Sequence, residues 1–294
     1  MPFASHDDVD IYYETFGDPA DPALLLVNGL GSQCINFRVE WCQMFAARGF
    51  FTIRFDNRDV GLSTTFDHVR PGVAEVARAL AEGREPDVAY RLADMADDAV
   101  AVLDDLGIER AHVMGLSMGG MIVQQLVIDH PERVHTMTSV MSSTGDRDVG
   151  QATPEAFAIL TGPPATDRTS AIERHLAGLR VFGSPAHYDA DRQSGYAGEA
   201  FDRSFNPAGV ARQMTAVMAS GSRAERLRSV LTPTLVLHGD ADRLVDISGG
   251  RRTAECIRGA RFVVMEGMGH DYPPAYWGRW VELVAEHAGL PPAR

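Results

Sequence analysis

The sequence predicts an α/β fold with a mostly parallel central sheet flanked by helices and interrupted by a helical insertion. Several short apolar runs lack the polar–apolar alternation of half-buried strands, which is typical of strands buried on both faces. These runs alternate with segments of helical spacing, as they do in βαβ units. Residues 143–228 break this rhythm, because they contain helical patterns and no convincing buried strand. We therefore expect a core formed by residues 1–142 and 229–294, with residues 143–228 as a helical cap.

The strands of the first part are recognised by composition and by where they end. Residues 9–16 are rich in β-forming side chains and are followed by Gly17, which predicts a strand that is antiparallel and near the sheet edge. The buried strands expected after it are 24–27, 50–55, 112–114 and 134–140. The helices expected between them are about 35–48, 90–106 and 121–128.

The cap and the last part of the core follow. Helical segments such as 169–182 and 207–219 are broken by Gly and Pro, yet apolar residues recur throughout. This pattern favours a packed helical unit over a linker. The core pattern then resumes as strand, helix, strand and helix, at 234–237, 249–257, 261–265 and 276–287.

The composition of this chain limits the classes of partner that it can bind. The 294 residues can bury a large core and can form one domain or two. The net charge is −13, from 27 basic and 40 acidic residues, and no run of Lys or Arg stands out. We therefore expect no nucleic-acid partner, and a neutral small molecule is favoured over a strongly anionic one. Oligomeric state is not predicted by any feature of the sequence.

Cysteine usage and hydropathy indicate the compartment. Cys34, Cys42 and Cys256 are an odd and sparse set, which fits reduced thiols in a cytoplasm. None of them is paired with histidines at metal-binding spacing. The first residues lack the basic and apolar regions of a signal peptide, and no apolar run has the length of a membrane span.

A glycine-rich turn, here called the elbow, reads Gly115-Leu116-Ser117-Met118-Gly119-Gly120. It lies between an expected strand and an expected helix, the context that a G-x-S-x-G nucleophile requires. A serine turned sharply out of a strand has a strained backbone, and glycines avoid the clashes that bulkier neighbours would cause there. The alternative, a glycine-rich turn with an unreactive surface serine, is disfavoured by the flanking strand and helix.

A serine hydroxyl is a weak nucleophile near neutral pH and needs a base that a carboxylate orients. His270 follows the last expected strand, and the two glycines near it let its loop turn back over the sheet. The acid is expected after the preceding strand, where Asp240, Asp242 and Asp246 are all candidates. His238 precedes the acid and is interpreted as structural, and Asp271 is expected to be exposed.

In this order of serine, acid and histidine the whole chain resembles an α/β-hydrolase-fold serine hydrolase. Residues 143–228 occupy the place of that family's cap. The stretch 16–27 and the loop 56–63 further resemble the aclacinomycin methylesterase branch.

The resemblance implies roles for particular residues. Asp242 matches the family acid and His270 the family base, whereas Asp240 is interpreted as capping its loop and Asp246 as solvated. The oxyanion hole is implied to consist of the backbone N–H groups of Met118 and Leu30, each such donor being worth about 10²–10³ in rate.

Two loops near the expected site depart from the family pattern. Asn28 stands where the family commonly has a loop-organising His, and we expect it to organise the loop by hydrogen bonding instead. Arg58 and Asp59 are interpreted as pinning their loop, although the family more often has Gly at the latter position.

The resemblance implies an acyl-enzyme mechanism that needs no metal and no organic cofactor. We expect a hydrolase that cleaves a carboxylic ester of a neutral, largely apolar small molecule. The alternatives are a lactonase, a C–C bond hydrolase or a perhydrolase with the same three residues, or a ligand receptor without turnover. A serine at the elbow disfavours haloalkane dehalogenase and epoxide hydrolase chemistry, where the family uses a carboxylate nucleophile.

The cap is expected to select the substrate. Apolar cap residues can line a pocket or merely pack the cap onto the core, and packing is favoured for most of them. The candidates are Phe157, Leu160, Leu179, Phe182, Phe201, Met214 and Met218.

Overall fold

A central sheet of eight strands organises the molecule, and the computed structural model describes residues 2–70 and 72–292. The strand order is β1-β2-β4-β3-β5-β6-β7-β8. The strands are β1 Phe3–His6, β2 Val9–Phe16, β3 Ala23–Val27, β4 Phe51–Phe55, β5 Ala111–Leu116, β6 Val134–Val140, β7 Thr234–Gly239 and β8 Arg261–Met265. β2 pairs antiparallel with β1 and β4, and the pairs from β4 to β8 are parallel. The mostly parallel sheet predicted from the sequence is confirmed.

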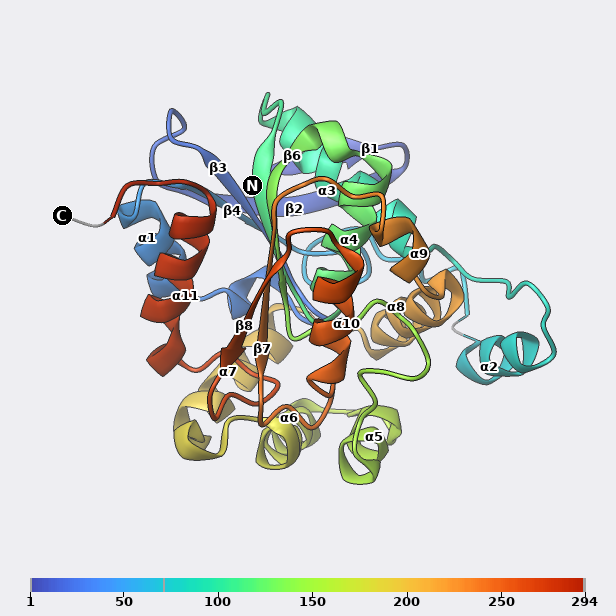
Figure 1. The fold of residues 1–294 in the computed structure, drawn as a ribbon. Helices are drawn as coiled ribbons and strands as arrows, with labels where there is room; N and C mark the ends of the chain where they lie inside the picture. The colour runs from blue at the N-terminus through green and yellow to red at the C-terminus, as the bar shows by residue number, and fades with distance from the viewer. Residues whose placement is uncertain (1, 71, 293–294) are drawn as a thin grey trace.

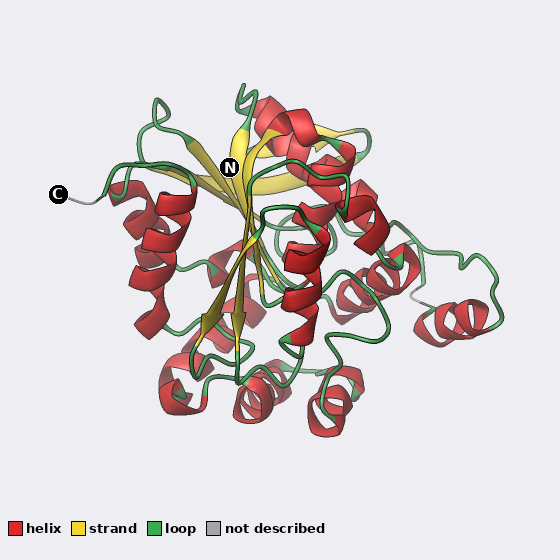
Figure 2. Cartoon of the chain, in the orientation of Figure 1, coloured by secondary structure: helices red, strands yellow, loops and turns green. Residues whose placement is uncertain are grey.

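Helices cover both faces of the sheet (Figures 1 and 2). They are α1 Val39–Ala47 and α11 Pro274–His287 on one face, and α3 Leu92–Asp105, α4 Met118–Asp129 and α10 Ser248–Cys256 on the other. Alternate residues of β3 explain the two hydrophobic cores, since side chains alternate across a strand. Leu24 and Leu26 pack with the aromatic residues of α1 and α11, whereas Leu25 and Val27 pack with α3 and α4.

The segment 143–228, here called the cap, is helical, and its helices α5, α6 and α7 lie near the carboxyl ends of β7 and β8 (Figure 1). Its elements are α5 Pro154–Thr161, α6 Arg168–Phe182, the short 3₁₀ turn η3 Pro185–His187, α7 Ala190–Arg203, α8 Pro207–Ser220 and α9 Ala224–Leu227. Residues 143–228 are all described, and none of them is in a strand. This placement puts the cap over the end of the sheet where parallel α/β folds hold their ligands.

Some elements differ from the sequence-based expectations. β1 was not predicted, and neither was α2, Val73–Ala81, an outlying helix that packs against α8. The helix expected at 35–48 is wrong in its first part: it divides into a 3₁₀ turn, η1 Cys34–Asn36, and α1. Phe37 interrupts it with a ψ of 89°, and its carbonyl accepts a hydrogen bond from the Arg54 guanidinium instead of a helical N–H. A further 3₁₀ turn, η2 Pro131–Arg133, leads into β6.

Over residues 2–70 and 72–292, no helix combines the length and apolar character that crossing a bilayer demands.

Candidate active site

The elbow joins β5 to α4 and holds Ser117 in a strained conformation. Ser117 has φ 56° and ψ −117°, in the region that only glycine adopts readily. A Cβ at Gly115 would lie 2.1 Å from the Gly119 carbonyl oxygen, and one at Gly119 would lie 2.1 Å from the Val27 carbonyl oxygen. Close backbone packing therefore requires both glycines and leaves the serine side chain at the start of α4.

Backbone N–H groups surround the elbow serine. The first helical hydrogen bond of α4 runs from the Met121 N–H to the Ser117 carbonyl, so the Met118 N–H lies ahead of the intrahelical ladder. The Ser142 hydroxyl also donates to the Ser117 carbonyl at 2.7 Å, and the Ser117 N–H donates to Val140 at 2.9 Å. The turn is thus fixed from both sides, with the positive end of the helix dipole beside the hydroxyl.

The structure brings Ser117, His270 and Asp242 together at the carboxyl end of the sheet. His270 Nε2 lies 2.9 Å from Ser117 Oγ, and its Nδ1 lies 2.7 Å from Asp242 Oδ2. Asp242 follows β7 and His270 follows β8, and these neighbouring parallel strands end at the same edge. With the proton on Nδ1, Nε2 is free to accept the serine proton.

The surroundings of Asp242 keep its carboxyl ionised. Burial alone would raise the pKa of its carboxyl, but charge and hydrogen-bond interactions with His270 and His238 outweigh burial and lower the pKa to about 2. Its second oxygen accepts the N–H groups of Leu244 and Val245, both at 2.9 Å. The carboxylate therefore has a fixed position from which to orient an imidazole.

The other candidates for the acid have different partners. Asp240 is exposed and accepts the Gly267 N–H at 2.7 Å, as its loop-capping interpretation predicts. Asp246 is exposed and accepts the Ser248 N–H at the start of α10. His238 is fully buried, bonds to the Val245 carbonyl at 2.8 Å and lies 3.5 Å from Asp242 Oδ2.

The expectation that Asp271 is exposed is wrong. This carboxyl is half-buried and accepts the Ser184 N–H at 2.9 Å, and burial raises its pKa. The neighbouring His270 N–H donates to the Phe182 carbonyl at 2.6 Å, and the Phe182 ring meets the imidazole edge-on at 6.3 Å. The cap segment after α6 thus holds the histidine loop, a contact for which the sequence contains no motif.

The loop after β3, residues 28–33, is here called the oxyanion loop, after the role that the family resemblance implies for Leu30. It lies against the elbow: a Cβ at Gly29 would lie 3.2 Å from the Ser117 Cβ. Asn28 is fully buried and its amide donates to the Gln33 carbonyl at 3.0 Å, while its own carbonyl accepts from Asn57 at 3.1 Å. Asn28 therefore organises the loop by hydrogen bonding, as expected, and Leu30 lies at its centre.

The loop after β4 is pinned by two buried ion pairs. Arg58 binds both oxygens of Asp98 at 2.6 and 2.7 Å. Asp59 has a φ of 72° and binds Arg212 of the cap at 2.7 and 2.8 Å. The pinning role expected for Arg58 and Asp59 is thus observed, and Asp59 in addition fastens the cap.

The apolar cap candidates separate into different environments. Phe157 is 57% exposed, and Phe201 pairs with the ring of Phe205 at a centroid distance of 4.6 Å. Phe182 is the candidate whose ring contacts His270. Packing or surface positions therefore account for the first two, and Phe182 is the apolar side chain nearest the reacting groups among these three.

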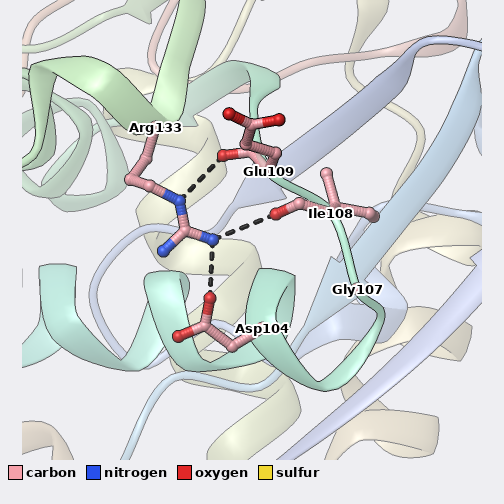
Figure 3. Close-up of a pocket in the computed structure, with 5 residues that line it drawn as sticks. All are labelled: Asp104, Gly107, Ile108, Glu109 and Arg133. Atoms are coloured by element: carbon pink, nitrogen blue, oxygen red, sulfur yellow. Dashed lines mark hydrogen bonds and ion pairs between the residues drawn. The ribbon is translucent and has the colours of Figure 1, made fainter.

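A surface depression of about 320 Å³ lies at the opposite end of the sheet, before β5 and β6 (Figure 3). The Arg133 guanidinium within it donates to Asp104 and to the carbonyls of Ile108 and Glu109. These hydrogen bonds give Arg133 a structural role. Over the described residues, no cluster of three or more His, Cys, Asp or Glu side chains has metal-binding geometry.

Comparisons with known proteins identify the family of this chain. A family model described as alpha/beta hydrolase fold matches residues 22–272. The chain is 30% identical to the rhodomycin D methylesterase DauP of Streptomyces sp. (strain C5), over 92% of this chain and 91% of that protein. It is also 30% identical to the rhodomycin D methylesterase DnrP of Streptomyces peucetius, over 92% of each chain. The solved structure of Est816, described as an N-acyl homoserine lactone degrading enzyme, is 26% identical with a TM-score of 0.71, covering 97% of this chain and 99% of that one.

Proposed function

The chain belongs to the alpha/beta hydrolase fold family and is a carboxylic-ester hydrolase, and from that premise we propose that Ser117, His270 and Asp242 cleave the ester of a neutral, largely apolar small molecule. The family and fold expected from the sequence are confirmed by the same matches. The observation that carries the proposal is the unbroken chain of hydrogen bonds from Ser117 Oγ through the imidazole to the Asp242 carboxylate.

The chemistry follows from these distances. Ser117 Oγ attacks the ester carbon while Nε2, 2.9 Å away, accepts its proton, and Asp242 stabilises the imidazolium formed. The tetrahedral intermediate places its negative oxygen toward the N–H groups of Met118 and Leu30. Collapse releases the alcohol, which takes the proton from His270. Water, activated by the same imidazole, then attacks the acyl-enzyme, releases the carboxylic acid and restores the serine.

Two observations support the substrate class. The net charge of −13 disfavours strongly anionic substrates, and Phe182 presents an apolar ring beside the imidazole. The two relatives at 30% identity are named as methylesterases. We therefore propose a small alcohol, such as methanol, as the leaving group, and the apolar part of the substrate on the acyl side under the cap.

Hydrolysis of a short-chain aryl ester tests the proposal. Wild type should hydrolyse it, and Ser117→Ala should lose about 10⁴-fold or more in kcat. Equal rates for the two proteins would show that Ser117 takes no part in the reaction. A fluorophosphonate separates the enzyme from a receptor on the same fold, because an activated Ser117 is labelled and an inert one is not.

A lactone is the second candidate substrate, because the chain is similar to Est816, which is described as an N-acyl homoserine lactone degrading enzyme. The acyl-enzyme steps are the same, except that the alcohol stays attached to the acyl chain. A panel of methyl esters and N-acyl homoserine lactones of matched acyl length discriminates them. Higher kcat/KM on the methyl esters supports our first proposal, whereas a preference for lactones of tenfold or more reverses it.

A further inference from the structure

The oxyanion loop is held by the cap as well as by the core. We infer that Gln213, on helix α8 of the cap, is a positioning residue that sets the Leu30 N–H for the oxyanion. The inference rests on the proposed function, because it assigns Gln213 a part in the same reaction. It concerns a residue with no motif around it in the sequence, 96 positions beyond the elbow serine at Ser117.

Gln213 is fully buried and uses both ends of its amide. Its Oε1 accepts the Gly31 N–H at 2.8 Å, and its Nε2 donates to the Arg58 carbonyl at 2.8 Å. One side chain thus joins the oxyanion loop to the loop after β4. A buried amide with both groups satisfied is held in one orientation, because rotation would leave unpaired polar atoms.

The peptide planes on both sides of Leu30 are therefore fixed. The Leu30 N–H shares a plane with the Gly29 carbonyl, which accepts the Ser32 N–H at 3.2 Å. The next plane contains the Gly31 N–H, which Gln213 binds. Gly31 has a φ of 66°, and a Cβ there would meet Val210 of α8 at 3.0 Å, so the same helix also packs on this turn. Loss of the Gln213 bond would free the second plane to rotate, and the Leu30 Cα, which joins the two planes, would shift with it and displace the Leu30 N–H.

Helix α8 is a rigid support for this bond. Arg212, the residue before Gln213, is buried and binds both oxygens of the buried Asp59. Asn206 caps the helix through the Gly209 N–H at 2.9 Å and also donates to the Asp59 carbonyl at 3.2 Å. The ion pair therefore fixes the position of α8 independently of Gln213, which lets the effect of Gln213 on the loop be tested without releasing the cap.

The chemical consequence concerns the transition state more than the bound substrate. An oxyanion is a stronger acceptor than an ester carbonyl, so a displaced donor costs more once the tetrahedral intermediate forms. Removing one such donor costs about 10²–10³ in rate, and displacing it costs less. We therefore expect the loss to fall on kcat, with KM nearly unchanged.

The test compares Gln213→Met with Thr215→Val in the full-length protein. Met has the length of Gln without its hydrogen bonds, and Thr215 lies on the same helix with its hydroxyl bonded to the Arg212 carbonyl of that helix. On a p-nitrophenyl ester, kcat of Gln213→Met should fall about 10–100-fold with KM within about threefold. The rate of fluorophosphonate labelling should fall in parallel, because the phosphonyl oxygen occupies the same site. Thr215→Val should retain wild-type kcat.

Other outcomes overturn the inference. A Gln213→Met protein with wild-type kcat, or with a change in KM alone, shows that Gln213 only packs or shapes the pocket. An equal fall in Thr215→Val assigns the effect to α8 in general. If Gln213→Met does not fold, Gln213→Asn replaces it: its amide is one methylene too short to span both partners, and the same fall in kcat is expected. Wild type that neither hydrolyses the ester nor accepts the label contradicts the proposed function itself.

Discussion

The elbow and the cap are held in place by different forces. At the elbow, backbone packs on backbone, and a Cβ at Gly115 or Gly119 would approach a carbonyl oxygen to 2.1 Å. The cap is instead fastened by ion pairs to buried carboxylates, among them Arg212–Asp59 and Arg203–Asp56. Backbone packing leaves a glycine signature that can be read locally in sequence. Side-chain pairs between residues about 150 positions apart leave none.

This difference separates two tasks. The core fixes the groups proposed to react, because Asp242 and His270 follow β7 and β8 at the edge where the elbow holds Ser117. The cap fixes what surrounds them, through Phe182 beside the imidazole and Gln213 on the oxyanion loop. Substitutions of Ser117, His270 or Asp242 should therefore act on chemistry, and those in the cap should act on stability, on substrate choice or, at Gln213, on oxyanion geometry.

The largest effect is expected at the acid. Asp242→Asn should lower kcat about 10³–10⁴-fold, because an amide can donate to Nδ1 and favours the tautomer that cannot accept the serine proton. Steady-state kinetics on the aryl ester measure this loss. Asp240→Asn is the matched control: it lies two residues earlier, is exposed and caps its loop through Gly267, so its kcat should stay within about threefold. If Asp240→Asn lowered kcat more than Asp242→Asn, Asp240 would be the acid.

Arg212→Met tests the ion pair with Asp59 that fastens the cap to the core. Its loss leaves Asp59 buried without its cation, which costs about 3–5 kcal/mol in the free energy of unfolding. Urea unfolding measures this value. Arg168, also in the cap, pairs with Asp202 at the surface, and Arg168→Met should leave the free energy of unfolding nearly unchanged. Similar losses in the two variants would mean that the buried pair does not hold the cap.

Acid should destabilise the core through His112, at the far end of the elbow strand. Burial, followed by the nearby His135 and His287, lowers the pKa of His112 to about 4 from 6.5. Between these two pKa values the unfolded chain therefore binds a proton at His112 that the folded chain does not bind. Stability is retained above pH 6.5 and falls as the pH drops from 6.5 toward 4, by on the order of 2 kcal/mol.

Unfolding of wild type and His112→Gln across this range checks the sign of that effect. The variant lacks the titrating ring, so its stability should depend less on pH. Parallel curves for the two proteins would assign the acid sensitivity to other groups.

The smallest effect is expected at a cap glycine. Gly195 lies inside α7, is exposed, and a Cβ there would meet no atom within 4 Å. Gly195→Ala should therefore stabilise the protein by about 0.5–1 kcal/mol through helix propensity, measured as a raised Tm. The same change at Gly119 should lower Tm and abolish fluorophosphonate labelling, because the Val27 carbonyl occupies the space. A Gly119→Ala protein with unchanged Tm and unchanged labelling would contradict the proposed difference between the elbow and the cap.

The sequence predicts most of the sheet and the proximity of the three residues proposed to react, because both are encoded locally. A buried strand is a short apolar run, and Ser117, Asp242 and His270 each follow such a run. The start of α4 at Met118 was placed three residues late, since the glycines of the elbow hide the helical pattern.

What the sequence does not reveal depends on long-range pairing. Gln213 and Arg212 are ordinary polar residues in sequence, and only the fold places them against the loops around the elbow. The fold likewise brings Gln33 of the oxyanion loop to the Ala200 carbonyl of the cap. Asp271 was expected at the surface because a charged residue usually lies there, but Ser184 of the cap covers it. β1 was missed because it is a four-residue strand with exposed positions, whose pairing with β2 gives it its structure.

The central claim is that Ser117 forms a covalent acyl-enzyme. Intact-mass spectrometry of the protein mixed rapidly with a p-nitrophenyl ester, followed by peptide mapping, tests it most directly. We predict a mass increase equal to one acyl group, located on the peptide that contains Ser117 and absent from Ser117→Ala. An acyl group on another residue, or ester turnover by a protein whose Ser117 never carries one, would contradict the account.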